Sequence, residues 1–314
     1  MATSSGAVVE SPRVLSIQSH VVSGYVGNKC AVFPLQALGF EVDFINSVQF
    51  SNHTGYGQWK GQILADTDLE DLYEGLKMNN LVNYSQILTG YVGSESFLRK
   101  IRDVVMRIKE KNPSAIYLCD PVLGDNGHFY VPESLIPIYQ NEVLPLADIT
   151  TPNNFELELL SGMKVTSEAE AMTAMDILHQ KGIPIVVLSS LDASGNDLAS
   201  YVSFRDSKDG PRRVWKTIIP RLQGIFTGTG DLFAALFLGV YSKLGKQNIP
   251  RVIESALSTM KVVLGRTKEK ADQRNIPVLP GEKPKPSELQ LVQSLDVILN
   301  PPSSCAAVEV NLGA

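Results

Sequence analysis

The residues that could carry chemistry lie in one short glycine motif, Gly228-Thr229-Gly230-Asp231, which leads directly into an apolar segment. Two glycines permit a tight turn whose backbone N–H groups converge, and the N-terminus of a following helix adds partial positive charge. Such a turn binds anions such as phosphate. A carboxylate beside that phosphate could accept the proton of an attacking hydroxyl group. The motif therefore indicates phosphoryl transfer to an alcohol, although the same residues would also suit a plain turn in which Asp231 complements the helix dipole.

These residues need a scaffold, and the chain predicts an α/β fold in which a mostly parallel sheet is covered by helices on both faces. Six short apolar runs alternate with amphipathic segments, at residues 13–18, 41–48, 86–90, 115–119, 148–151 and 184–189. Apolar residues at spacings of three and four predict a surface helix over residues 94–112. Two capping boxes, Thr67 with Glu70 and Ser167 with Glu170, predict two further helix starts. Functional residues should lie where the strands end.

The chain changes in character after residue 190. Runs at 198–204 and 213–219 lie among turn-rich segments and predict an antiparallel hairpin at the sheet edge. Helices are expected over 229–244 and 250–267, then a connector rich in Pro, Lys and Gly over 276–286, and an edge strand over 288–292. No repeat or separating linker is present. We therefore expect a single domain over residues 13–314, preceded by a disordered tail over residues 1–12.

Composition excludes several classes of protein. The 314 residues include 28 basic and 33 acidic side chains, a formal charge of −5, which argues against a nucleic-acid-binding protein. Hydrophobic residues make up 44% of the chain, enough for a large core, yet no apolar stretch approaches the roughly 18 residues of a membrane span. Three widely spaced cysteines without a CxxC pair indicate neither disulfides nor a zinc cluster. These features, with no leader-like N-terminus, predict a cytoplasmic protein without membrane partners.

Longer blocks around the glycine motif carry a resemblance. GTGDLFAA at 228–235 resembles the signature of the ribokinase-like superfamily. Within it, the chain is similar to the pyridoxal kinases through five blocks in the expected order: RVLSIQSHVVSGYVGNKCAVFPLQALGF at 13–40, INSVQFSNHTGY at 45–56, LTGYVGS at 88–94, CDPVLGD at 119–125 and TPNNFELELLSG at 151–162. The resemblance implies a ribokinase-like domain and ATP-dependent phosphorylation of the 5′-hydroxymethyl group of pyridoxal, and also of pyridoxine and pyridoxamine, in vitamin B6 salvage. It further implies Mg²⁺, K⁺ or another monovalent cation, and a homodimer.

The resemblance also implies which residues bind the vitamin. Asp231 would be the base that takes the proton of the substrate hydroxyl, and Gly228, Thr229 and Gly230 would cradle the transferred phosphoryl group, with Gly228 also touching the substrate. A flat pocket with a few placed hydroxyls suits a small polar aromatic ring. Its implied members are two hydroxyl residues and three apolar ones: Ser19, Thr54, Phe50, Tyr91 and Val26. Taken one at a time, each would more often be structural, as would His20 and His53.

On the nucleotide side, the resemblance implies hard oxygen ligands, which suit Mg²⁺. The implied residues for the ATP phosphates and Mg²⁺ are Asp120, Asp125, Asn153 and Glu156; those for the monovalent cation are Asp120, Thr151 and Ser189; and Ser189 and Ser190 also contact the nucleotide. Ser189 and Ser190 stand where many animal relatives have threonine followed by serine. The loop over residues 126–129 is short, so closure over ATP is less secure. Contacts of residues 221–225 with adenine stay open.

Three alternatives differ from this interpretation. Another ribokinase-like small-molecule kinase, such as one acting on hydroxymethylpyrimidine, would share the anion-binding turn and the nucleotide chemistry. A dinucleotide-dependent dehydrogenase would need a GxGxxG motif after the first strand, and the sequence has none there. A vitamer-binding protein without activity would have no need of a carboxylate beside a phosphate cradle. The intact GTGD motif therefore favours the kinase.

Overall fold

Ten strands form one sheet within the part of the chain that the computed structural model describes, which is residues 11–312 without 194–195, 208–209 and 275–286. The order across the sheet is β12-β11-β10-β9-β8-β5-β4-β1-β2-β3. The strands are β1 Arg13–Val21, β2 Glu41–Phe50, β3 Gly61–Ile63, β4 Gln86–Thr89, β5 Ile116–Cys119, β8 Ile149–Thr150, β9 Ile185–Asp192, β10 Asp197–Arg205, β11 Arg212–Pro220 and β12 Ala307–Glu309. A separate two-stranded hairpin joins β6 Gly124–Asp125 to β7 His128–Phe129.

The centre of the sheet is parallel and both edges are antiparallel. The parallel block runs β2-β1-β4-β5-β8-β9, and each of its strands overlaps one of the six predicted runs. The predicted hairpin is confirmed as β10 and β11, which pair antiparallel over their whole length. From β1 the chain crosses to β2 on one side, whereas from β4 it crosses to β5 on the other. The order therefore reverses between β1 and β4, the place where α/β sheets bind ligands beyond the carboxyl ends of their strands.

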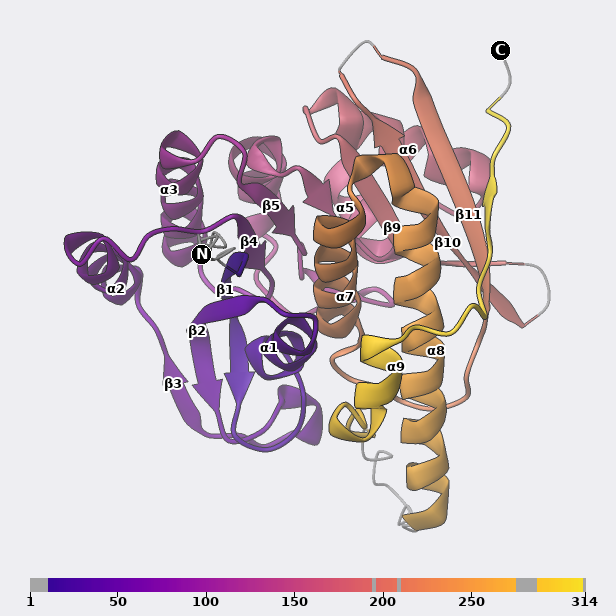
Figure 1. Ribbon diagram of the computed structural model, residues 1–314, viewed down its shortest axis with the longest axis horizontal. Coiled ribbons are helices and arrows are strands. Elements are labelled where there is room, and N and C mark those ends of the chain that lie inside the picture. The colour runs from indigo at the N-terminus through magenta and orange to yellow at the C-terminus, as the bar shows by residue number, and fades with distance from the viewer. Residues whose placement is uncertain (1–10, 194–195, 208–209, 275–286, 313–314) are drawn as a thin grey trace, which may run out of the picture.

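Helices cover both faces of the sheet, as predicted (Figure 1). On one face lie α2 Asp66–Met78, α3 Glu95–Lys111, α4 Leu135–Ile138, α5 Asn154–Ser161 and α6 Glu168–Gln180. On the other lie α1 Asn28–Ala37, α7 Thr229–Leu244, α8 Ile249–Arg274 and α9 Leu295–Leu299. The pleat divides the strand residues between two cores, so that Val14 packs towards α7 and Leu15 towards α3. None of the described helices is both long and apolar enough to cross a bilayer.

The predicted helix boundaries hold in part. Ser94 caps α3 by accepting the Phe97 N–H at 3.3 Å, and Ser167 caps α6 by accepting the Glu170 N–H at 3.3 Å. The capping box at Thr67 is wrong. Helix α2 begins at Asp66, and the carboxylate of Asp68 accepts the N–H of Ala65 at 2.8 Å. Glu70 instead pairs with Lys100 and Arg107 of α3. Its spacing of three residues from Thr67 matched a capping box, but its carboxylate forms ion pairs on the helix surface.

The predicted edge strand at 288–292 is also wrong. Ser287 makes a single bridge to Phe226, and the edge of the sheet is β12. Leu289 and Leu291 are fully buried in the core beneath α7 and α8, so the alternating apolar pattern reflects burial rather than strand pairing. Helix α8 extends to Arg274, beyond the predicted end at 267. The predicted tail, up to residue 10, and the connector at 276–286 lie outside the described residues.

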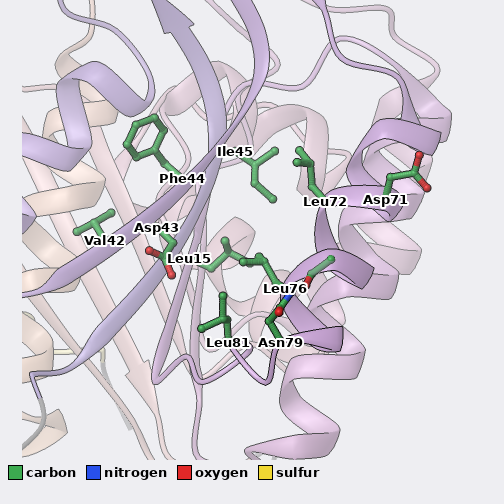
Figure 2. A pocket seen from close by; sticks show the side chains of 11 residues that line it. Leu15, Val42, Asp43, Phe44, Ile45, Asp71, Leu72, Leu76, Asn79 and Leu81 are labelled. Carbon is green, nitrogen blue, oxygen red and sulfur yellow. Dashed lines mark hydrogen bonds between the residues drawn. The ribbon is translucent and has the colours of Figure 1, made fainter.

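A cavity of about 610 Å³ lies between β2 and α2, away from the predicted site (Figure 2). Its lining is mostly apolar, with Phe44 from β2 and Leu72 and Leu76 from α2. Two carboxylates line it, Asp43 and Asp71, and Asp43 is engaged because Arg13 lies 2.6 Å away and the Tyr84 hydroxyl donates to it at 2.9 Å. None of its eleven lining residues is a predicted site residue.

Candidate active site

The glycine motif forms the predicted turn at the N-terminus of α7. Gly228 has φ +81°, and a Cβ there would lie 2.2 Å from the carbonyl oxygen of Tyr25, so glycine is required. Helix α7 starts at Thr229 and is buried from Leu232 to Val240, which fixes its axis. The first N–H groups of a helix lack partners within the helix. The turn therefore presents converging donors and the positive end of the α7 dipole.

Asp231 lies in the first turn of α7, where the following helix is rigidly packed. Its Oδ2 accepts the backbone N–H of Gly27 at 2.7 Å, which fixes the orientation of the carboxylate. Burial raises the pKa of Asp231, and the Gly27 N–H partly offsets that rise. The side chain remains partly exposed. A fixed, accessible carboxylate with a raised pKa has the properties of a general base.

Ser19 and Val26 lie next to Gly27, whose N–H holds this carboxylate. The pairing of β1 with β2 shifts between Gln18 and His20, which places Ser19 at the shift. The Asn28 side chain stabilises this geometry by donating to the carbonyl of Gln18 at 3.3 Å and, across the strands, to that of Ile45 at 2.9 Å. Gly27 has φ +53°, and a Cβ there would lie 2.0 Å from the Ser19 carbonyl oxygen. Ser19, Val26 and Asp231 are thus brought together.

The other predicted vitamin contacts follow β2 and β4. Phe50 ends β2 beside Val21 of β1, and its ring lies 6.3 Å from that of Trp59. Thr54 is exposed and opens a short 3₁₀ helix, Thr54–Tyr56. Tyr91 follows β4, and its carbonyl accepts the Ser47 hydroxyl of β2 at 2.8 Å. The segment after β1 is tied to that after β2 by the Ser23 N–H, which donates to the Ser51 carbonyl at 2.9 Å, and the segment after β4 is tied to β2 through Ser47.

Asp120 lies between the glycine motif and the residues predicted to bind the nucleotide. It follows β5, its Oδ1 accepts the Thr151 hydroxyl at 2.8 Å, and its Oδ2 lies 3.7 Å from the position of a Cβ on Gly230. Burial, together with the negative charge of Asp231, raises the pKa of Asp120 to about 7, and the hydrogen bond from Thr151 opposes this rise. The structure thus places Asp120, Thr151 and the glycine motif next to one another.

Glu156 and Asn153 hold the β6–β7 hairpin. Asn153 caps α5 by accepting the Glu156 N–H at 2.9 Å, and its side chain donates to the Gly124 carbonyl at 2.8 Å. The Glu156 carboxylate accepts the N–H groups of Asn153 at 2.9 Å and Leu123 at 3.0 Å. Burial and then the charge of Asp120 raise the pKa of Glu156 well above its usual value, against these backbone donors. Both residues therefore have a structural role beside the predicted nucleotide role.

The short loop after Asp125 is a tight hairpin turn. Asn126 has φ +50° and Gly127 φ +79°, the left-handed pair that two-residue hairpins favour. The Asp125 carboxylate accepts the Asn126 N–H at 2.9 Å and stays exposed at the base of the turn. The predicted flap is thus a two-residue turn projecting from β6 and β7.

Ser189 and Ser190 lie in β9 where its parallel pairing ends. The Ser189 N–H donates to the Pro152 carbonyl at 3.0 Å, which places Ser189 beside Thr151. Both serines are partly exposed. Arg221, in the segment left open for adenine, pairs with Asp192 at the end of the same strand.

The donor set of the nucleotide side fits a cation held largely through phosphate and water. The described residues contain no group of three or more His, Cys, Asp or Glu side chains arranged as a complete metal site. However, Asp120 and Glu156 are buried, and their pKa values are raised by burial and by like charge. A cation would offset that charge, and Mg²⁺ typically uses only one or two protein carboxylates.

Comparisons with known proteins place the chain in a family. The family described as "Phosphomethylpyrimidine kinase" matches residues 80–264. Human pyridoxal kinase is 46% identical over 307 residues, which cover 93% of this chain and 96% of the human protein. The chain belongs to the pyridoxal kinase family. Pyridoxal kinase of Arabidopsis thaliana is 47% identical over 291 residues, covering 92% of each chain.

Solved structures agree with this family. Pyridoxal kinase from Leishmania donovani in complex with ADP and pyridoxamine superposes with a TM-score of 0.87 at 33% identity, covering 95% of this chain and 99% of that chain. Pyridoxal kinase from Trypanosoma brucei gives a TM-score of 0.83 at 32% identity. The ribokinase-like fold predicted from the sequence is thereby confirmed.

Sequence reasoning missed two residues that shape the site of this pyridoxal kinase family member. Gly27 supplies the N–H that orients Asp231, yet the two are 204 positions apart. Glu288 contacts two of the vitamin-side loops, although it lies in the segment that was assigned to a strand. Gly27 could have been found from its place in the SGYVG stretch, residues 23–27. No local sequence pattern marks Glu288 as a residue of the site.

Proposed function

We propose that this chain transfers the γ-phosphoryl group of ATP to the 5′-hydroxymethyl group of pyridoxal, and also of pyridoxine and pyridoxamine. The observation that carries the proposal is the Asp231 carboxylate, held by the Gly27 N–H at the positive end of α7 and between the vitamin-side loops and Asp120. Membership of the pyridoxal kinase family supports it, as does the Leishmania donovani relative with ADP and pyridoxamine.

In the proposed reaction Asp231 accepts the proton of the substrate hydroxyl. The hydroxyl oxygen forms a bond to the γ-phosphorus while the bond between that phosphorus and the β–γ bridging oxygen breaks, and ADP leaves. The Gly27 N–H holds the Asp231 carboxylate in place. The raised pKa of Asp231 makes this carboxylate a stronger base. The N–H groups of Gly228, Thr229 and Gly230 stabilise the charge that accumulates on the transferred group. Ser19, Thr54, Phe50, Tyr91 and Val26 would bind the pyridine ring.

Asp120, Asp125 and Glu156 would hold Mg²⁺, directly or through water, and Asp120, Thr151 and Ser189 would surround a monovalent cation such as K⁺. Mg²⁺ supplies neutralisation of the triphosphate charge. The support is the pair of buried carboxylates, which form no ion pair with the side chains that the structure describes and whose pKa values are raised by burial and by neighbouring carboxylates. Asn153, Ser189 and Ser190 would contact the nucleotide. Residues Asn126 and Gly127 would bring the hairpin turn over it.

The proposal includes a homodimer and a cytoplasmic location. The family resemblance supports the homodimer. Cys30, Cys119 and Cys305 are free thiols in the structure, which suits a reducing compartment.

The test is the appearance of pyridoxal 5′-phosphate when purified protein meets pyridoxal, MgATP and K⁺, followed by absorbance. Product from the wild type is expected, with a large loss in Asp231→Asn. Phosphorylation of hydroxymethylpyrimidine in preference to pyridoxal would overturn the vitamin assignment. That second candidate is favoured by one observation, the family description that matches residues 80–264. Competition between the two substrates in one assay separates them.

A further inference from the structure

The carboxylate of Glu288 contacts two loops that are far apart in the sequence. Its Oε2 accepts the backbone N–H of Tyr25 at 2.9 Å, and its Oε1 accepts the Tyr56 hydroxyl at 2.9 Å. The Nε2 of His53 lies 3.2 Å from the same Oε1. A Cβ on Gly24 would lie 2.5 Å from both oxygens, so glycine there lets the loop approach the carboxylate.

These loops carry the predicted vitamin contacts. Residues 22–27 follow β1 and include Val26, and residues 51–57 follow β2 and include Thr54. The first loop also continues to the base, because the Tyr25 carbonyl packs against Gly228 and the Gly27 N–H holds Asp231. A short covalent path of three residues, Tyr25 to Gly27, therefore separates Glu288 from the carboxylate that would take the proton.

The backbone of Glu288 is itself held firmly. Leu289 and Leu291 are fully buried, and the Gln290 N–H donates to the Thr267 hydroxyl of α8 at 3.1 Å. On the other side, the Ser287 N–H donates to the Ile225 carbonyl at 2.9 Å, next to the chain that enters the glycine motif. Glu288 thus lies in a segment, residues 287–291, whose backbone is held by α8 on one side and by Ile225, just before the glycine motif, on the other.

The charge of Glu288 is compensated. Burial by itself would raise the pKa of this carboxyl group, yet the contacts with His53, Tyr56 and Tyr25 outweigh burial and keep the pKa below its usual value. The carboxylate is therefore ionised at neutral pH, and hydrogen bonds to an ionised acceptor are the strong ones.

We propose that Glu288 is a positioning residue that clasps the 22–27 and 51–57 loops together, so that the vitamin pocket is formed before substrate arrives and the Gly27 N–H stays on Asp231. This inference rests on the proposed function for its consequence in catalysis, but the clasp is a property of the protein without substrate. Glu288 does not touch the reacting atoms and acts through the two loops.

The first test measures the clasp without any ligand. In Glu288→Gln one carboxylate oxygen becomes an NH₂ group that faces a donor, so one loop loses its partner. The other loop keeps an oxygen acceptor but loses the negative charge that strengthened its hydrogen bond. Amide hydrogen exchange should become several-fold faster in both loops, 22–27 and 51–57. The matched control is Asp296→Asn, which removes an ion pair between the same C-terminal segment and Arg266 of α8. Faster exchange in both loops in Glu288→Gln alone supports the clasp, and unchanged exchange in either loop overturns it.

The second test separates pocket formation from chemistry. Pyridoxal binding is followed by fluorescence of Trp59, which lies beside Phe50, and by steady-state kinetics. Glu288→Gln should raise the KM and Kd for pyridoxal about tenfold and leave the KM for ATP within about twofold, with partial recovery in Glu288→Asp. Equal changes for both substrates would overturn the positioning role. A wild type that phosphorylates no alcohol would refute the proposed function, while the exchange measurement would still judge the clasp.

A double-mutant cycle with Tyr56→Phe tests whether the two residues act together. Tyr56→Phe removes one donor to Glu288 without changing the carboxylate. If the clasp is right, the two substitutions together should raise the pyridoxal Kd by less than the product of their separate effects. Independent, multiplicative effects would contradict it.

Discussion

The proposed vitamin side and nucleotide side of the site differ in how far the protein compensates the charge of their carboxylates. On the vitamin side, the carboxylates receive donors from the protein itself: Glu288 from Tyr25 and Tyr56, and Asp231 from Gly27. On the nucleotide side, Asp120 accepts the Thr151 hydroxyl and Glu156 accepts backbone N–H groups, yet both pKa values are raised. The largest cause is burial, followed by the charge of Asp231 on Asp120 and of Asp120 on Glu156. The difference teaches that the protein's own donors outweigh burial at Glu288, whereas the charge of Asp120 and Glu156 would be offset by a bound cation.

The largest expected effect is on the chemical step, at the junction of the two halves. Asp231→Asn removes the base while keeping an oxygen for the Gly27 N–H, so the pocket should persist. We expect kcat to fall about a thousandfold. Binding of pyridoxal, measured by Trp59 fluorescence, should stay within about threefold of the wild type. Near-normal turnover in a folded variant would show that Asp231 is not the base.

The next effect tests how tightly the vitamin side is built. Gly228→Ala combines a positive φ with a Cβ 2.2 Å from the backbone of Tyr25, so the turn must move away from the 22–27 loop. We expect kcat/KM for pyridoxal to fall about a hundredfold. Gly162→Ala is the matched control, since it has a similar φ of +75° but no atom within 4 Å of its Cβ. That control should lose about 1 kcal/mol of stability and keep its activity.

If Gly228→Ala and Gly162→Ala lowered activity equally, the close packing of the turn against Tyr25 would not matter for catalysis. Thermal unfolding of both variants separates a loss of stability from a loss of geometry. If the turn moves, Gly228→Ala should lower kcat/KM far more than Gly162→Ala does, while the two variants lose similar amounts of thermal stability.

The sequence predicted the parts of this architecture that repeat locally. Each parallel strand appeared as an apolar run, and α3 appeared through six buried residues at helical spacing. The GTGD motif was visible because a tight turn and a helix start both need particular residues at fixed neighbouring positions. Local periodicity was therefore enough for the fold class. Turn chemistry made Asp231 a candidate base, and the family resemblance then favoured that role over a plain turn.

The parts that the sequence did not reveal depend on contacts between distant segments. Glu288 reaches Tyr25 across 263 positions, and no local pattern marks such a partner. The 288–292 segment has alternating apolar residues because Leu289 and Leu291 enter the core, and that burial produces the same pattern as a strand. Likewise Glu70 matched a cap by spacing but serves an ion pair with α3.

A smaller effect, on thermal stability, tests whether the buried charge of Asp120 on the nucleotide side destabilises the folded state. The folded pKa of Asp120 is about 7, above its usual value of 3.8, so between these two values the folded state binds a proton that the unfolded state lacks. Stability therefore falls as pH rises through this range, and the cost is complete above pH 7. Asp120→Asn should raise Tm by about 2–3 °C at pH 8 and by little at pH 5, while activity falls.

The comparison variant is Asp296→Asn, because the Arg266 guanidinium lowers the pKa of Asp296 to about 2. Its stabilising contribution is present above the unfolded pKa, hence at both pH 5 and pH 8. Asp296→Asn should lower Tm slightly and equally at the two pH values. If the change in Tm of Asp120→Asn were the same at pH 5 and pH 8, the charge of Asp120 would not destabilise the folded state.

The smallest expected effect concerns Ser189, which is predicted to contact the nucleotide and the monovalent cation. Its N–H is held by the Pro152 carbonyl and its side chain is partly exposed at the end of the parallel pairing of β9. Ser189→Thr keeps the hydroxyl and adds a methyl group that a strand accommodates, so the KM for ATP should stay within about twofold. Ser189→Ala loses the hydroxyl and should raise the K⁺ concentration for half-maximal activity about threefold. A tenfold change in Ser189→Thr would mean that the nucleotide side is packed as tightly as the turn at Gly228, and the contrast between the two halves would then be one of charge alone.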